Sequence, residues 1–167
     1  MKLSYFFSMP EAYTFDMPKV LEWTTKQLAG RVLNVFCGKN KIKGAVNCDI
    51  DPDMHPDVLC DAMQLSEIFS PMEFDTAILD PPYSMHQAVG NYNGHHCHQI
   101  TAVRDQLVDL VKKRLIWFGW SIPATPGFKK IEILLVGHGG SHNATICTVE
   151  DRKFHSLREY TGDEQSQ

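Results

Sequence analysis

The chain has 167 residues, a length that fits one domain with a sizeable buried core. Hydrophobic residues make up 43% of it and charged residues 22%, proportions that exclude a disordered, collagen-like or disulfide-scaffold chain. The formal net charge of -4 argues against a protein that binds nucleic acid over its whole surface, although lysine clusters leave a local contact open. We therefore expect a single domain over residues 1–167.

The amino-terminal segment carries no long apolar core with a cleavage site, and no apolar run approaches the length of a membrane span. A cytoplasmic location without membrane contact is the default expectation. The five cysteines are an odd number, and three of them lie in apolar runs typical of strands. We expect reduced, buried thiols rather than a disulfide framework.

Apolar periodicity predicts one opening helix, which begins near Asp16 and Pro18 and has Gly30 in the left-handed position at its end. A second helix is predicted where Ile100, Val103, Leu107, Leu110 and Val111 repeat at helical spacing. Short apolar runs predict seven strands, at residues 31–36, 45–50, 58–60, 74–79, 115–120, 131–136 and 144–149.

The lengths of the connections predict the topology. Residues 137–143 are too few for a crossover helix, so the last two strands should form an antiparallel hairpin. Only Lys39 to Gly44 separate the first two strands, so the usual helix is missing there as well. The prediction is an α/β fold with a mostly parallel seven-stranded sheet that ends in an antiparallel pair.

Polar residues follow four successive predicted strands. Because ligands bind at the carboxyl ends of parallel strands, these residues should meet on one rim. Gly38 would let a ligand approach the backbone, Asp49 could accept hydrogen bonds from ribose hydroxyls, and Asp61 could accept one from an adenine amino group. Taken singly, each is also an ordinary turn or helix-cap residue. The fourth strand ends in the turn Asp80-Pro81-Pro82-Tyr83.

Residues 31–83 resemble the class I S-adenosylmethionine-dependent methyltransferases, and within them the amino-methyltransferases of adenine and cytosine. The run from Asn34 to Asn40 is similar to their Asp-x-Phe-x-Gly-x-Gly cofactor loop. Asp49 and Ile50 match the ribose-binding strand end, and Asp61 with Ala62 matches the adenine-binding turn. The Asp-Pro-Pro-Tyr sequence matches the catalytic tetrad.

The resemblance implies a Rossmann-like fold and S-adenosyl-L-methionine as cofactor. It also implies that Asp80 and Pro81 accept hydrogen bonds from the amino group to be methylated, while Tyr83 stacks on the base. The implied catalytic residues are Asp80, Pro81, Pro82 and Tyr83, and the implied cofactor residues are Asn34, Phe36, Cys37, Gly38, Asp49, Ile50, Asp61 and Ala62.

Two departures from the family pattern bear on function. Asn34 and Asn40 stand where the family has an aspartate and a second glycine, which suggests weaker cofactor binding. No segment remains for a target-recognition domain, so loops, a homodimer or a partner subunit would have to supply specificity. The altered loop also leaves open a non-catalytic subunit that binds nucleic acid.

The aspartate-led tetrad favours adenine-N6 methylation of DNA, with cytosine-N4, RNA adenine, and a small-molecule or protein amide as alternatives. A target base in a duplex would have to flip out of the stack. The histidine-rich loop at residues 86–98 would overhang the substrate as a lid or nucleic-acid contact. Its adjacent histidines cannot easily converge on one ion, so we expect no metal.

Overall fold

The computed structural model describes residues 1–82, 89, 99–140 and 142–154, and one eight-stranded sheet organises them. The strand order across the sheet is β1-β7-β8-β6-β5-β2-β3-β4. The strands are β1 (Lys2–Phe7), β2 (Val32–Val35), β3 (Val46–Asp49), β4 (Val58–Leu59), β5 (Phe74–Leu79), β6 (Val111–Gly119), β7 (Phe128–Gly137) and β8 (Thr145–Arg152).

The strand directions confirm the predicted α/β fold. β2 pairs in parallel with both β3 and β5, and β5 pairs in parallel with β6. β8 runs antiparallel to both β6 and β7, which confirms the carboxyl-terminal hairpin. β7 therefore runs in the same direction as β5, and its carboxyl end lies on the same edge of the sheet.

The predicted count of seven strands was wrong, because β1 adds an eighth at the edge next to β7. The exposed Leu3, Tyr5 and Phe7 alternate with the half-buried Ser4 and Phe6, so most of the apolar side chains of β1 are exposed. Since only one face and one edge of β1 are covered, the strand lacks the continuous apolar run that marks the central strands.

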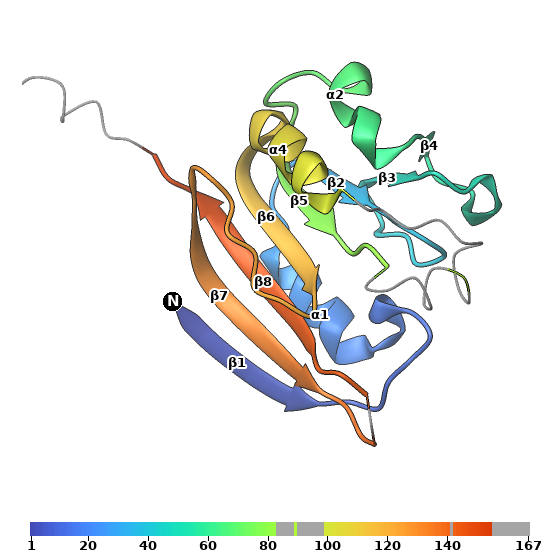
Figure 1. Cartoon of the computed structure of the whole chain (residues 1–167), viewed down its shortest axis with the longest axis vertical. Helices are drawn as coiled ribbons and strands as arrows, with labels where there is room; N and C mark the ends of the chain where they lie inside the picture. The colour runs from blue at the N-terminus through green and yellow to red at the C-terminus, as the bar shows by residue number, and fades with distance from the viewer. Residues whose placement is uncertain (83–88, 90–98, 141, 155–167) are drawn as a thin grey trace, which may run out of the picture.

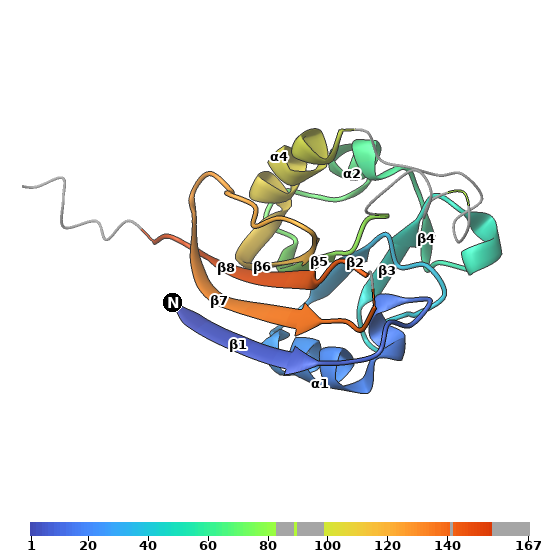
Figure 2. The ribbon, with the colours of Figure 1, turned by 60° about the horizontal axis from the view of Figure 1, so that its bottom comes forward.

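Helices cover both faces of the sheet (Figures 1 and 2). α1 (Pro18–Gln27) packs on one face, and α2 (Leu65–Ile68) and α4 (Ile100–Leu110) lie on the other. The link between β2 and β3 holds no helix, as its length predicts. Within the described residues, no helix combines the length and apolarity that a bilayer crossing requires.

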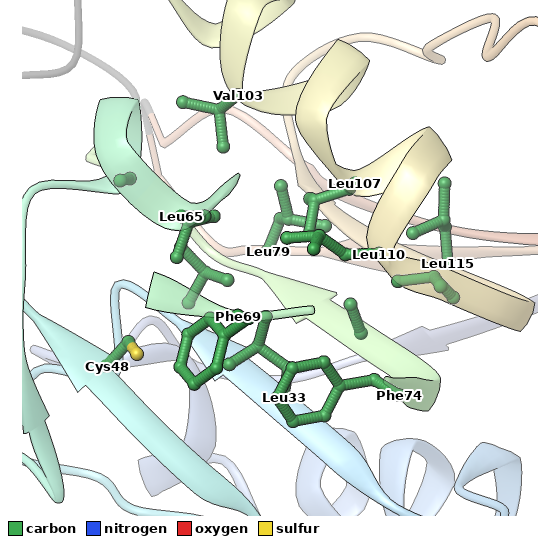
Figure 3. Close-up of a cluster of buried hydrophobic side chains, with 14 of the residues drawn as sticks. Leu33, Cys48, Leu65, Phe69, Phe74, Leu79, Val103, Leu107, Leu110 and Leu115 are labelled. Atoms are coloured by element: carbon green, nitrogen blue, oxygen red, sulfur yellow. The ribbon is translucent and has the colours of Figure 1, made fainter. Parts of the chain in front are cut away.

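The larger apolar cluster lies between the central strands and the helices α2 and α4. Figure 3 shows Leu107 and Leu110 of α4 above Leu79 and Leu115 of the sheet, with Leu65 of α2 beside them. All five side chains are at most 1% exposed. Burial of such a side chain contributes roughly 1.5–3 kcal/mol, so this cluster fixes the positions of the central strands.

Gly30 does not end the opening helix as predicted. α1 stops at Gln27, Leu28 is extended, and Gly30 adopts a φ of 61° in the turn that follows. A Cβ added to Gly30 would lie 2.1 Å from the Asp75 carboxylate. That carboxylate accepts the Arg31 N–H at 2.9 Å and pairs with Lys113 at 3.2 Å. It thus links the amino ends of β2, β5 and β6, and the absence of a side chain at Gly30 leaves space for it.

Replacing Gly30 by alanine should therefore destabilise the protein more than a left-handed backbone alone explains. Gly44→Ala is the matched control, because Gly44 has a φ of 83° but a Cβ added there would meet no atom within 4 Å. Both variants bear the left-handed cost of about 1–3 kcal/mol. Gly30→Ala should lose a further ~1–3 kcal/mol in urea unfolding, because the Asp75 hydrogen bonds are displaced. Equal losses in the two variants would refute this role for Asp75.

Candidate functional site

The register of three central strands brings the predicted loops to one rim. Val35 pairs with Leu79 on one side and with Cys48 on the other. Phe36 follows β2, Asp80 follows β5 and Asp49 is the last residue of β3, so the loops after these strands leave the same edge of the sheet. Neighbouring strands lie about 4.8 Å apart, so the three loops start within about 10 Å of one another.

The Asp49 carboxylate links two of these loops. One carboxylate oxygen, Oδ2, accepts the Gly38 N–H at 2.8 Å, and Oδ1 accepts the Asp51 N–H at 3.0 Å. A carboxylate offers about four acceptor positions, so two remain for a ligand. Asp49 thus holds the first loop in place while it keeps hydrogen-bonding capacity on the rim.

The first loop turns sharply after β2. Phe36 has a φ of 62° and Gly38 one of 52°, on either side of Cys37, whose N–H donates to the Cys48 carbonyl at 2.9 Å. A positive φ is uncommon for a bulky residue and occurs mainly where the surrounding structure enforces it. Here the hydrogen bonds to Asp49 and Cys48 enforce it, so the chain's own contacts shape the loop.

Asn34 lies inside the sheet rather than in the loop. Its side chain is fully buried, its Nδ2 donates to Asn47 Oδ1 at 3.0 Å, and its Oδ1 accepts no hydrogen bond from the described residues. Asn34 therefore lies beneath the rim, and its contact with a cofactor stays a prediction. The structure brings it together with Asn47, a residue that the sequence analysis did not single out.

Asn47 organises the short link between β2 and β3. Its side-chain amide donates to the Ile42 and Ala45 carbonyls and to Asp57 Oδ2, and its Oδ1 accepts the Ile42 N–H. The bonds from Asn47 hold the pKa of Asp57 below its ordinary value. A buried asparagine within an apolar strand is the sequence signal that points to such a role. Through Asn47 the chain positions the link without a crossover helix.

The remaining predicted cofactor residues lie along the β3 and β4 ends of the rim. Ile50 is 40% exposed directly after Asp49. The Cys60 N–H donates to the Asp49 carbonyl at 2.9 Å, which places Asp61 next along the edge. Asp61 Oδ1 accepts the Met63 N–H at 2.9 Å, and Ala62 is buried behind it. The rim thus presents an apolar side chain between two carboxylates.

The predicted catalytic turn begins at the carboxyl end of β5. Asp80, Pro81 and Pro82 are each partly exposed there. Burial, together with the nearby charge of Asp80, raises the pKa of the Cys147 thiol on β8. Tyr83 and all but Val89 of the histidine-rich loop at residues 86–98 lie outside the described residues.

Three cysteines lie beside the rim, and all four cysteines in the described part of the chain are free thiols. Burial and the charge of Asp49 raise the pKa of Cys37 to about 12. Cys60 differs, because a hydrogen bond from the Cys48 thiol lowers its pKa. The same contact raises the pKa of Cys48.

Two lysine clusters lie at the amino ends of the strands, and one lies beside the rim at their carboxyl ends. Lys113 and Arg114, at the amino end of β6, pair with Asp75 and Asp151, and Lys130, at the amino end of β7, pairs with Glu150. These two clusters serve ion pairs within the chain on the edge away from the rim. The exposed Lys39, Lys41 and Lys43 follow the rim loop, where they add positive charge beside the candidate site.

Alkylation should distinguish Cys60 from Cys37. Because the thiolate is the reactive form, iodoacetamide at mildly alkaline pH should modify Cys60 at least about tenfold faster than Cys37. Peptide mass mapping over time measures both rates in one sample. Cys60→Ser is the control and should leave the slow labelling of Cys37 unchanged. Faster labelling of Cys37 would contradict the assigned pKa order.

No family model and no curated protein matches the chain in sequence. Among the solved structures that match its fold are two N-methyltransferases. One is the Burkholderia thailandensis 1,6-didemethyltoxoflavin-N1-methyltransferase with bound 1,6-didemethyltoxoflavin and S-adenosylhomocysteine, at a TM-score of 0.54 and 9% identity over 78% of this chain and 74% of that one. The other is the N-methyltransferase NodS from Bradyrhizobium japonicum WM9, at 0.52 and 10% identity over 81% and 93%. The chain therefore has the Rossmann-like fold of these N-methyltransferases.

Proposed function

We propose that the protein is an S-adenosyl-L-methionine-dependent methyltransferase that acts on an amino nitrogen. One observation carries the proposal: Asp80 leaves the sheet beside Phe36, while Asp49, on the other side of β2, holds Gly38. A nucleoside between the Gly38 and Asp49 loops would thus have Asp80 next to it. The fold shared with two N-methyltransferases supports this proposal.

The rim residues fit the proposed cofactor. The two acceptor positions left on Asp49 suit the two hydroxyls of a ribose, and the exposed Ile50 offers an apolar surface to an adenine ring. Asp61 keeps its Oδ2 for an amino group, since Oδ1 binds Met63. Gly38 lacks a side chain that would separate the ligand from the loop. When bound, the cofactor supplies an electrophilic methyl group.

Asp80 and Pro81 would prepare the acceptor nitrogen. An amine conjugated to an aromatic ring is a poor nucleophile because its lone pair is delocalised. The Asp80 carboxylate and the Pro81 carbonyl can each accept one N–H, which favours a pyramidal nitrogen with a localised lone pair. The two prolines restrict the backbone and hold these acceptors in place.

Adenine-N6 in DNA is the substrate we propose, on two grounds. Aspartate leads the Asp-Pro-Pro-Tyr sequence, and Lys39, Lys41 and Lys43 lie beside the rim where a phosphate backbone would pass. Cytosine-N4 and RNA adenine are the nearest alternatives. A small heterocyclic amine is a second candidate, because one structural neighbour was crystallised with such a molecule.

Substitutions should separate cofactor binding from catalysis. Asp49→Ala should weaken S-adenosylhomocysteine binding about 10- to 100-fold in calorimetric titration, because the lost bonds involve a charged group. Asp53→Ala removes an exposed carboxylate nearby and should leave binding unchanged. Asp80→Ala should bind the cofactor normally but lose about 10²–10³-fold in kcat. Absence of saturable binding to the unmodified protein would instead favour the non-catalytic subunit.

Transfer of a labelled methyl group identifies the substrate. The protein is incubated with labelled cofactor and with single-stranded DNA, duplex DNA or RNA, and the product is digested to nucleosides. We expect N6-methyldeoxyadenosine from DNA, with single strands modified faster because no base has to flip. Asp80→Ala is the background control. Cofactor binding without methylation of any polymer would reject a nucleic-acid substrate and favour the heterocyclic amine.

A further inference from the structure

β1 forms an outer edge of the sheet with unpaired backbone groups. It pairs with β7, and no strand of the described chain lies on its other side. The Ser8 N–H donates to the Gly137 carbonyl at 3.0 Å, so by alternation the even-numbered residues direct their backbone toward β7. The N–H and C=O groups of Leu3, Tyr5 and Phe7 therefore point outward.

A row of exposed apolar side chains runs along β1 and just past both of its ends. Met1, Leu3, Tyr5, Phe7 and Met9 are 80%, 72%, 64%, 53% and 63% exposed. From Leu3 on they alternate with half-buried residues, of which Phe6 contacts Lys19 of α1. Figure 2 shows α1 beneath β1, while α2 and α4 lie over the other end of the sheet. The row is thus an apolar face that the described chain leaves uncovered.

β1 also lacks the usual protection of an exposed edge. Natural edge strands carry charges, prolines or bulges that prevent pairing with another chain. The one charged residue in β1 is Lys2, which lies at its start and pairs with Glu132 of the adjacent β7 at 2.9 Å. Strand pairing in β1 is continuous with β7 from Lys2 to Phe7, without a register shift.

We propose that two copies of this chain associate through antiparallel pairing of β1 with itself, centred on Tyr5. Leu3 then lies opposite Phe7 of the second copy, and Tyr5 lies opposite its own equivalent. All three residues have outward backbone groups, so each opposing pair exchanges two N–H···O bonds. Cross-strand apolar and aromatic pairs stabilise such an arrangement, and no like charges face each other.

Pairing of the two edges buries part of this row. It covers the flank of each side chain that faces the second copy and leaves the outer side, on the face of the sheet, exposed. The interface is therefore smaller than the standard one of about 800 Å² per partner. We expect a dimer at the weak end of the range, in which the backbone bonds between the two edges add to the side-chain contacts. The strands run in opposite directions, so the two rims lie at opposite ends of the joined sheet and act independently.

Tyr5→Lys tests the interface, because it sets two ammonium groups against each other at the centre of the paired strands. Sedimentation velocity should give the mass of two chains for the unmodified protein. For Tyr5→Lys, the dissociation constant should rise at least about tenfold. Ile68→Lys is the control: this α2 side chain is 45% exposed, lies away from β1, and should leave the dimer intact. Unchanged thermal unfolding shows that the variants are folded.

A paired substitution tests the register. In Leu3→Lys/Phe7→Glu, antiparallel pairing about Tyr5 sets the new ammonium of each copy beside the new carboxylate of the other. The double variant should therefore dimerise more tightly than Leu3→Lys alone, and added salt should reverse the gain. One chain's mass at every concentration would overturn the proposal. A dimer that persists in Tyr5→Lys, or no gain in the double variant, would overturn it equally.

Discussion

The parallel pairing of β2 with both β3 and β5 is the constraint on which the candidate site depends. These strands run into three loops from a single edge, and the apolar cluster under α2 and α4 holds them in register. Asp49 then fixes the loop after β2 through the Gly38 N–H. A one-residue shift of β2 would move Val35 or Cys37 into the position of Phe36 and send alternate side chains to the wrong face.

The chain forms this arrangement with a short link between β2 and β3 that holds no helix. The link after β2 is too short for a crossover helix, and the side chain of Asn47 positions its second half instead, through bonds to Ile42, Ala45 and Asp57. Asn34 completes this buried polar group from the neighbouring strand. Asn34 stands where the methyltransferases that the sequence resembles have an aspartate, and here it has a structural role: its Nδ2 donates to Asn47, which a carboxylate could not do.

The sequence was sufficient to predict the central strands, because strands buried on both faces have unmistakable apolar runs, and β5 has the predicted bounds. It did not predict the edge strand β1, because most of the apolar side chains there are exposed and the strand lacks the apolar run of a buried one. It also missed Asn47: an asparagine within an apolar strand signals a buried polar role, but the sequence does not show which groups Asn47 binds. For the site, strand order predicted that Gly38, Asp49 and Asp80 share a rim, but not that Asp49 itself binds Gly38. Tyr83 stays a prediction.

In the proposed site, the Gly38 and Asp49 loops hold a nucleoside whose sulfur faces Asp80. A crystal structure of the protein with S-adenosylhomocysteine would show where this ligand lies. We expect ribose hydroxyls on Asp49, adenine on Ile50 and the sulfur directed to the turn at Asp80. Binding of the ligand elsewhere, or with its sulfur turned away from Asp80, would contradict it.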